Sequence, residues 1–326
     1  MDVGVVGAGI VGLSTAFALL ERGAGVTVYE RGTPGAAGSG GESRIFRHAH
    51  DDPRLVAAAV EGRELWREWE KRFGVELVSG DGSVLIGPAA ERRAALLRDA
   101  GVPVRAVSAH PLLGPCGGMV DEAAGVIRTR AAVHALVDGV GDRIVPEEVV
   151  AVTAGGEVRA GGVTARHERV VVCAGRDTPT LAGDVGTDLR TFPHVRLTFA
   201  LRDEPPARLP CLQDGRHGTY GDPLPGNARY AVGLGDDPGE TIAYVAGAMP
   251  GLVPEPLEAR HCWAVELPWG PDGMAVWESG RALFFAGGNL FKHAPWVGRA
   301  LAGAALGDGV PDLLRPESQL GRTAGM

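Results

Sequence analysis

The chain has 326 residues, of which 45% are hydrophobic and 22% charged, and its net charge is −8. This balance predicts a globular protein of about two domains, soluble and cytoplasmic, and argues against a nucleic-acid-binding surface. The apolar N-terminal stretch is interrupted by glycines, so neither it nor any later segment predicts a signal peptide or a membrane span. The four cysteines contain no CxxC pair, which argues against a zinc site or a disulfide framework; they are Cys116, Cys173, Cys211 and Cys262.

The first elements of the chain have the pattern of a nucleotide-binding βαβ unit. Residues 3–6 predict a buried strand, and Gly7, Gly9 and Gly12 follow with G-x-G-x-x-G spacing at the start of a helical periodicity. These glycines permit a tight turn and close approach to a pyrophosphate, which the positive helix N-terminus attracts. The next strand, "AGVTVYE", ends at Glu30, which is placed to bind ribose hydroxyls.

Helices and strands alternate in the next part of the sequence. The expected elements are a flexible connection at 35–41, a helix at 54–73, a hairpin at 75–88, a helix at 90–100, a loop-rich stretch at 101–127 with a strand at its end, a helix at 131–140, and strands at 144–153, 157–164 and 169–173. The last strand is apolar throughout and ends in small residues, which is typical of a central parallel strand beside a cofactor. Cys173 in this strand is expected to be a small apolar side chain without a reactive role.

The sequence changes character over residues 190–260, where proline-rich turns separate short alternating strands. This pattern predicts a second, antiparallel domain inserted into the first. The C-terminal part returns to a strand at 282–288, a loop at 289–295 and a helix at 296–305. The last residues of the polar tail are expected to be disordered.

The stretch "GESRIFRHAH" at 41–50 concentrates positive charge in an acidic chain. It predicts either a solvated loop tip or a site for an anion or an electron-rich ring. No spacing in the sequence pairs its histidines, or those further along, with a carboxylate, so we expect structural roles for His48, His50, His217 and His293 and no metal site.

Several segments together resemble the FAD-dependent amine and amino-acid oxidoreductases of the D-amino-acid oxidase superfamily, which includes monomeric sarcosine oxidase and N-methyltryptophan oxidase. They are the N-terminal βαβ unit, "GESRIFRHAH", "CAG" at 173–175 and "LFFAGGNLFKHAPWVGRALA". The resemblance implies a mixed α/β fold, in which a Rossmann-like FAD-binding domain of glutathione-reductase type carries an inserted antiparallel-sheet substrate domain. The implied FAD-binding domain comprises 1–75, 128–190 and 258–326, and the substrate domain comprises 76–127 and 191–257.

The activity implied by the resemblance is FAD-dependent oxidation of the C–N bond of a carboxylate-bearing amine to an imine. The substrate is a small secondary amine, imino acid or amino acid, the electron acceptor is O₂ or unknown, and the protein is expected to be a monomer. Arg44 matches the arginine beside the isoalloxazine, where it stabilises the reduced flavin. Arg47 and Lys292 match the residues that anchor the substrate carboxylate. Cys262 matches the position at which relatives form a thioether to FAD.

The resemblance also implies a larger set of residues around the cofactor. They are Gly7, Gly9, Ile10, Val11, Gly12, Glu30, Arg31, Ser39, Ser43, Arg44, Val150, Ala174, Gly175, Cys262, Gly287, Gly288, Asn289, Leu290, Phe291 and Lys292.

The chain departs from the family pattern where relatives carry a lysine that promotes reaction with oxygen. Ala231 occupies this place, with Arg229 nearby. Pocket-lining residues of relatives are also replaced, by Ala264 and near Gly235, which predicts a reshaped pocket. Two alternatives to an oxidase therefore stay open. One is a flavin-dependent dehydrogenase or desaturase of specialised metabolism that uses another acceptor, and the other is a non-catalytic flavin-binding partner protein.

Overall fold

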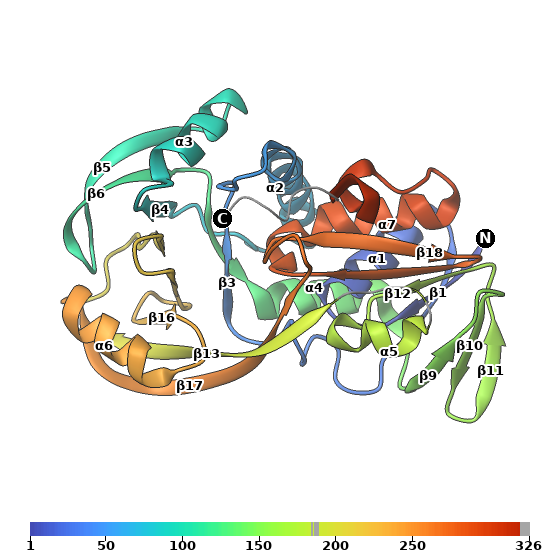
Figure 1. Cartoon of the computed structure of the whole chain (residues 1–326). Coiled ribbons are helices and arrows are strands. Elements are labelled where there is room, and N and C mark those ends of the chain that lie inside the picture. The colour runs from blue at the N-terminus through green and yellow to red at the C-terminus, as the bar shows by residue number, and fades with distance from the viewer. Residues whose placement is uncertain (184, 186–188, 320–326) are drawn as a thin grey trace. The chain divides into compact units, whose positions relative to one another are not determined.

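The computed structural model describes residues 1–183, 185 and 189–319, and the chain divides into two compact units (Figure 1). Unit 1 consists of Met1–Gly40, Ala132–Phe192 and the chain from Trp263 onward, and unit 2 of Gly41–Ala131 and Pro193–Cys262. Residues 41–75, which the sequence analysis assigned to the cofactor domain, thus group by their contacts with unit 2. The assignment of FAD and substrate to particular segments stays a prediction.

Unit 1 is built on a six-stranded sheet that is parallel except at one edge. Its strands, in spatial order, are β18 (Met274–Ser279), β19 (Ala282–Gly287), β12 (Arg169–Val172), β1 (Asp2–Val6), β2 (Gly25–Tyr29) and β8 (Ile144–Val145). Only β18 runs antiparallel to its neighbour among these described strands. Helices α1 (Ile10–Glu21) and α7 (Ala294–Leu306) pack against each other so closely that a Cβ on Gly298 would lie 2.6 Å from the Ser14 side chain.

The rest of unit 1 includes a separate small sheet, seen at one end of its ribbon in Figure 1. This sheet contains β9 (Val149–Val152), β10 (Glu157–Ala160) and β11 (Val163–Arg166), and the remaining helices are α4 (Thr129–Val140) and α5 (Thr178–Ala182). Its apolar residues join those of the large sheet in one core, in which Val158, Val170 and Phe284 are almost fully buried. The α/β class predicted from the sequence is confirmed.

Unit 2 is built on an eight-stranded, mainly antiparallel sheet. Its strands, in spatial order, are β17 (Leu252–Glu266), β13 (Arg190–Leu201), β16 (Arg229–Gly233), β15 (Thr219–Pro223), β14 (Cys211–Asp214), β4 (Ser83–Ile86), β6 (Gly114–Asp121) and β5 (Val104–His110). The other elements are the pair β3 (Ser43–Phe46) and β7 (Gly125–Arg128) and the helices α2 (Pro53–Phe73), α3 (Ala90–Asp99) and α6 (Pro238–Ala248). The core of the sheet buries Val195, Phe199 and Tyr230 together with Tyr244 and Val245 of α6.

Four predictions about local structure are wrong. Residues 75–88 form no hairpin, because β4 pairs with β6 and β14 instead. The stretch 101–127, expected to be rich in loops with one strand at its end, contains the three strands β5, β6 and β7. The single strand expected at 144–153 is broken into β8 and β9, which join different sheets. Helix α6 interrupts the strands expected at 190–260. The expectation of disorder at the C-terminal end concerns 320–326, which lie outside the described residues.

Among the described residues, no helix is both long enough and apolar enough to cross a membrane.

We expect the buried His110 at the end of β5 to make the stability of unit 2 depend on pH. Its Nδ1 accepts a hydrogen bond from the Leu112 amide at 3.2 Å, and its Nε2 lies 3.3 Å from the Pro210 carbonyl, so the neutral ring carries its proton on Nε2. Burial lowers the pKa of His110 to about 4, against a weaker upward effect of the Pro210 carbonyl. The unfolded chain therefore binds the proton first as the pH falls below the ordinary histidine pKa of about 6.5.

We expect the free energy of unfolding to fall by about 3 kcal/mol between pH 6.5 and 4 through this one group. Urea unfolding of the wild type and His110→Gln across this range measures the effect, because the variant lacks the titrating ring. Equal pH slopes for the two proteins would rule out His110 as the cause.

Candidate functional site

In unit 1 the turn between β1 and α1 forms a backbone cradle. Gly7 has a φ of +97°, and a Cβ at this residue would lie 2.6 Å from the Cys173 carbonyl at the end of β12. A Cβ at Gly12 would lie 1.8 Å from the Gly7 carbonyl oxygen, so a side chain at this position cannot be accommodated without moving the turn. Gly9 is the N-cap of α1 and has no side chain that could cap the amides of the first turn.

Two polar side chains flank this cradle. The Ser39 hydroxyl accepts a hydrogen bond from the Ile10 amide at 2.9 Å, in the first turn of α1. Glu30, directly after β2, accepts hydrogen bonds from the amides of Ala8 at 2.8 Å and Gly32 at 2.9 Å. Both contacts fix the carboxylate at the carboxyl end of the sheet, and a carboxylate has acceptor capacity for further donors such as ribose hydroxyls.

The neighbouring strand ends contribute small residues to the same unit. Ala174 and Gly175 follow β12, and the Ala174 Cα would lie 3.4 Å from a Cβ on Gly7. Gly287 ends β19, and a Cβ on the following Gly288 would lie 2.1 Å from the Pro271 carbonyl oxygen. Close backbone packing at these strand ends therefore requires glycine.

Lys292 lies in the short 3-10 helix Leu290–His293 after β19 and is almost completely buried, with 3% of its side chain exposed. Its Nζ donates to Asp272 Oδ1 at 3.0 Å and to the Asn289 carbonyl at 2.9 Å. Asn289, in the left-handed region at φ +51°, donates from Nδ2 to the same Asp272 oxygen at 3.1 Å. The ammonium group of Lys292 is thus held by an acidic partner that the sequence analysis did not identify.

Unit 2 gathers arginines around the first residues of β3. Arg44 Nη1 and Arg196 Nη1 both donate to the Ser43 carbonyl at 2.8 Å, so two guanidinium groups share one acceptor. Arg196 Nη2 also donates to Ser43 Oγ at 3.0 Å and to Asp222 Oδ1 at 2.6 Å. Burial and the charges of Arg196 and Arg260, partly offset by Tyr220 and Asp222, together lower the pKa of Arg44 to about 10.

Tyr220 and His194 extend this group with a polar pair. The Tyr220 hydroxyl lies 2.5 Å from His194 Nε2, and the two rings are stacked with centroids 5.7 Å apart. Burial raises the pKa of Tyr220, while burial and the charges of Arg196 and Arg44 lower the pKa of His194. Both groups are therefore neutral near pH 7.

Cys262 lies next to this pair, and its Sγ contacts the His194 carbonyl at 3.5 Å. Residues two apart on a strand share a face, so Arg260 lies on the same side of β17 as Cys262, whereas His261 lies on the opposite side. Of the two basic neighbours of Cys262 in the sequence, Arg260 is thus the one on the same face of the strand.

Arg47 is half-buried. Its Nη1 donates to the Ala49 carbonyl and lies 3.4 Å from His50 Nδ1.

His48 has a carboxylate partner that its sequence spacing did not reveal. Its amide donates to Asp121 Oδ2 at 2.9 Å, and its Nδ1 lies 3.1 Å from the same carboxylate. His217 likewise lies 3.0 Å from Asp214 Oδ2. Sequence spacing thus did not reveal the carboxylate partners of His48 and His217, and the structural roles expected for these histidines stay a prediction.

The structure thus brings one part of the expected cofactor set together in unit 1, namely Gly7, Gly9, Ile10, Val11, Gly12, Glu30, Ser39, Ala174 and Gly175. Arg31 pairs instead with Glu148 and Asp177, and Val150 lies exposed on β9. Gly287 ends β19, Gly288 and Asn289 follow it, and Leu290, Phe291 and Lys292 belong to the short 3-10 helix Leu290–His293 of the same unit, where the sequence predicted a loop. Ser43, Arg44 and Cys262 belong to unit 2, as does Arg47.

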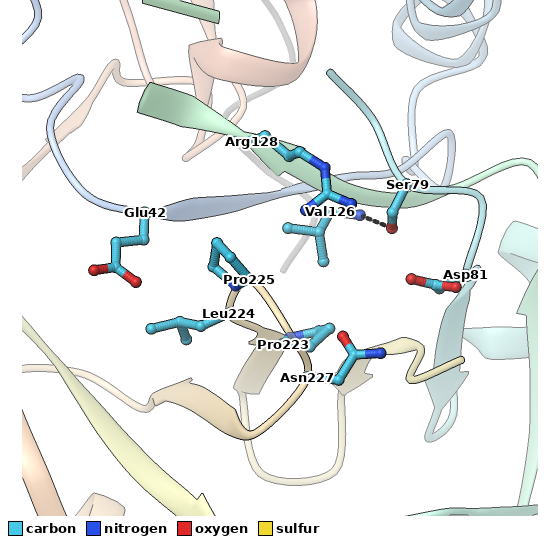
Figure 2. A pocket seen from close by; sticks show the side chains of 9 residues that line it. All are labelled: Glu42, Ser79, Asp81, Val126, Arg128, Pro223, Leu224, Pro225 and Asn227. Carbon is cyan, nitrogen blue, oxygen red and sulfur yellow. Dashed lines mark hydrogen bonds between the residues drawn. The ribbon is translucent and has the colours of Figure 1, made fainter. Parts of the chain in front are cut away.

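A small surface hollow lies elsewhere in unit 2. Figure 2 shows Glu42, Asp81, Arg128 and Asn227 around an open space of about 270 Å³, with the Val126 amide bonded to Ser79 at its wall. Glu42 in this wall pairs with Arg229 at 2.8 Å. The hollow includes none of the residues that the sequence analysis selected, and we assign it no role.

Comparisons with known proteins agree with this geometry. A family model described as FAD dependent oxidoreductase, with the short name DAO, matches residues 2–304. The glycine cradle, the helix N-terminus with its glycine N-cap and Glu30 are the features that the dinucleotide part of FAD requires, so the residues of unit 1 fit this cofactor. No curated protein matches the chain in sequence.

Solved structures resemble the chain over nearly its whole length. NikD, described as an unusual amino acid oxidase essential for nikkomycin biosynthesis, has 21% identity and a TM-score of 0.83, covering 97% of both chains. Glycine oxidase from Geobacillus kaustophilus has 18% identity and a TM-score of 0.79, covering 95% of this chain and 97% of its own. L-proline dehydrogenase from P. horikoshii has 17% identity and a TM-score of 0.81, covering 96% and 94%. At these identities the likenesses establish the fold.

Proposed function

The chain belongs to the FAD-dependent oxidoreductase family, and on this basis we propose that it oxidises the C–N bond of a carboxylate-bearing amine to an imine. The observation that carries the proposal is the cluster of arginine side chains around β3. Arg44 and Arg196 both donate to the Ser43 carbonyl, and Arg47 lies three residues after Arg44 in the sequence. An amine substrate with a carboxylate supplies an anion that such groups bind. The amino acid oxidase and L-proline dehydrogenase among the similar structures support the same substrate class.

The residues of the chain take separate roles in this proposal. The β1–α1 turn holds the pyrophosphate and Glu30 the ribose, while bound FAD supplies the hydride-accepting chemistry. Arg44 provides positive charge for the reduced isoalloxazine ring. Arg47 binds the substrate carboxylate through its planar fork of donors, and Lys292 assists it. Asp272 provides the opposite charge for the buried ammonium group of Lys292.

The proposal is tested by adding glycine, sarcosine, proline and other N-alkyl amino acids to the oxidised holoprotein without oxygen. Bleaching of the flavin absorbance by at least one of them, with formation of the corresponding oxo acid after imine hydrolysis, is the expected result. A yellow protein that none of these compounds bleaches would favour the non-catalytic flavin-binding alternative.

One observation favours an electron acceptor other than O₂. Ala231, at the place of the family lysine, is buried in β16, and Arg229 is 37% exposed and paired with Glu42. Neither residue therefore provides an unpaired buried cation. Air should re-oxidise the substrate-reduced protein slowly and an artificial quinone or dye acceptor quickly; fast re-oxidation by air would instead support an oxidase.

Covalent attachment of FAD through Cys262 stays a prediction. We expect acid-precipitated wild-type protein to keep its yellow colour in the pellet and Cys262→Ser to release its flavin into the supernatant, because only the thiol can form the thioether. Cys116→Ser removes another half-buried thiol of unit 2 and serves as the matched control. Release of all flavin from the wild type would contradict the link.

A further inference from the structure

The arginine group of unit 2 gathers positive charge around Arg44. The charges of Arg196 and Arg260 both act on the Arg44 guanidinium, in a region that also holds the buried carboxylate of Asp222. A Cβ on Gly41 would lie 2.8 Å from Arg44 Nη1 and 3.6 Å from Arg260 Nη1, so these two side chains converge on the same point of the backbone. Like charges at such separations repel unless an anion lies between or beside them.

The buried pair of Arg196 and Asp222 connects this group to the sheet. Their side chains are 9% and 1% exposed, and they approach to 2.6 Å. Arg196 Nε and Asp222 Oδ2 are buried and have no hydrogen-bond partner among the described residues. An ion pair with this degree of desolvation contributes little net stability, so its presence indicates a role in placing charge.

Arg196 also determines where Arg44 lies. Both side chains donate to the Ser43 carbonyl, and Arg196 binds the Ser43 hydroxyl as well. Asp222 lies on β15 directly opposite Ala231 of β16. The pair therefore anchors the first residue of β3 to the centre of the eight-stranded sheet and holds the Arg44 guanidinium beside that anchor.

We propose that Arg196 and Asp222 are a positioning pair that fixes Arg44 and, with Arg260, completes a cationic site for a planar, delocalised monoanion. The inference rests on the proposed function, in which this anion is the reduced isoalloxazine ring. The charge of Arg196 makes the electrostatic potential at the ring more positive, and the charge of Asp222 makes it less positive. Removing either partner must then change the affinity of the site for negative charge in opposite directions.

Sulfite binding to the oxidised holoprotein tests this inference without substrate turnover. Sulfite donates an electron pair to N5 of the oxidised ring, forms an N–S bond and leaves the negative charge on the ring, so nearby cations tighten its binding. Arg196→Met should weaken sulfite binding about tenfold, and Asp222→Asn should tighten it by a similar factor, because each change alters one charge. Arg196→Lys should retain most of the wild-type affinity.

The matched control is Arg105→Met, which removes an arginine of the same unit that also lies 2.6 Å from a carboxylate, Glu122, but is 64% exposed. It should leave sulfite affinity unchanged. A purely structural role of the pair predicts weaker binding in both Arg196→Met and Asp222→Asn, and this result, or no change in either, would overturn the inference. If Arg196→Met does not retain FAD, the direction of the change in Asp222→Asn decides alone.

Arg44→Met separates this inference from the proposed function. If Arg44→Met weakens sulfite binding while the substitutions of Arg196 and Asp222 have no effect, only the positioning role fails. If Arg44→Met also has no effect, the placement of Arg44 beside the flavin fails with it.

Discussion

Arg47→Ala is expected to weaken the binding of a carboxylate substrate by about 2–5 kcal/mol, since the substrate carboxylate would be desolvated without its two-pronged partner. The effect should appear mainly in KM and in the Kd of an unreactive carboxylate inhibitor, measured from its perturbation of the flavin spectrum. The rate of flavin reduction at saturating substrate should change much less, because the anchor binds ground state and transition state alike.

A matched pair of substrates distinguishes lost anchoring from a disturbed fold. Arg47 also donates to the Ala49 carbonyl, so its removal can shift the chain around it. An N-methylamine that lacks the carboxylate should be oxidised with nearly the same KM by wild type and variant, whereas the N-methyl amino acid should lose affinity. Equal losses for the two compounds would refute the assignment of Arg47 to the carboxylate.

Gly12→Ala is expected to abolish FAD binding and to destabilise unit 1. The added Cβ would lie 1.8 Å from the Gly7 carbonyl oxygen, and this neighbour is backbone, which cannot move aside as a flexible side chain can. Overpacking of this kind typically costs about 1–3 kcal/mol, and the turn that would bind the pyrophosphate must also deform. The ratio of flavin to protein after purification and the Tm of the apoprotein measure the two effects.

Gly247→Ala provides the control for this substitution. Gly247 lies in α6, where an added Cβ meets no atom within 4 Å, so alanine should raise stability slightly through its better helix propensity. Normal FAD content in Gly12→Ala would show that the β1–α1 turn does not carry the pyrophosphate.

The βαβ unit at the start of unit 1 could be predicted from the sequence because its signals are local. The glycines, the helix and the strand that precedes Glu30 follow one another within a single βαβ unit, and the backbone geometry of the turn follows directly from the glycine spacing. Helix α6 also had a local signal that the sequence analysis overlooked, since Asp237 caps it and Pro238 starts it.

The arginine group had no such signal. Arg196 lies far from Ser43 in the sequence, and only the pairing of β13, β16 and β15 brings it to Asp222. Strand β6 was also missed, because local sequence does not show the pairing that makes it a strand. β6 contains "GPCGG", whose small residues give no alternation of apolar and polar side chains, although pairing with β4 and β5 makes it a strand.

Anaerobic mixing of the oxidised holoprotein with an N-methyl amino acid, followed at the flavin absorbance, tests the central claim most directly. We predict that the flavin bleaches in a single turnover, that one equivalent of the substrate's C–N bond is oxidised for each flavin reduced, and that the matching amine without a carboxylate requires a much higher concentration. A flavin that stays oxidised with every carboxylate-bearing amine, or that is bleached equally well by amines without the carboxylate, would contradict it.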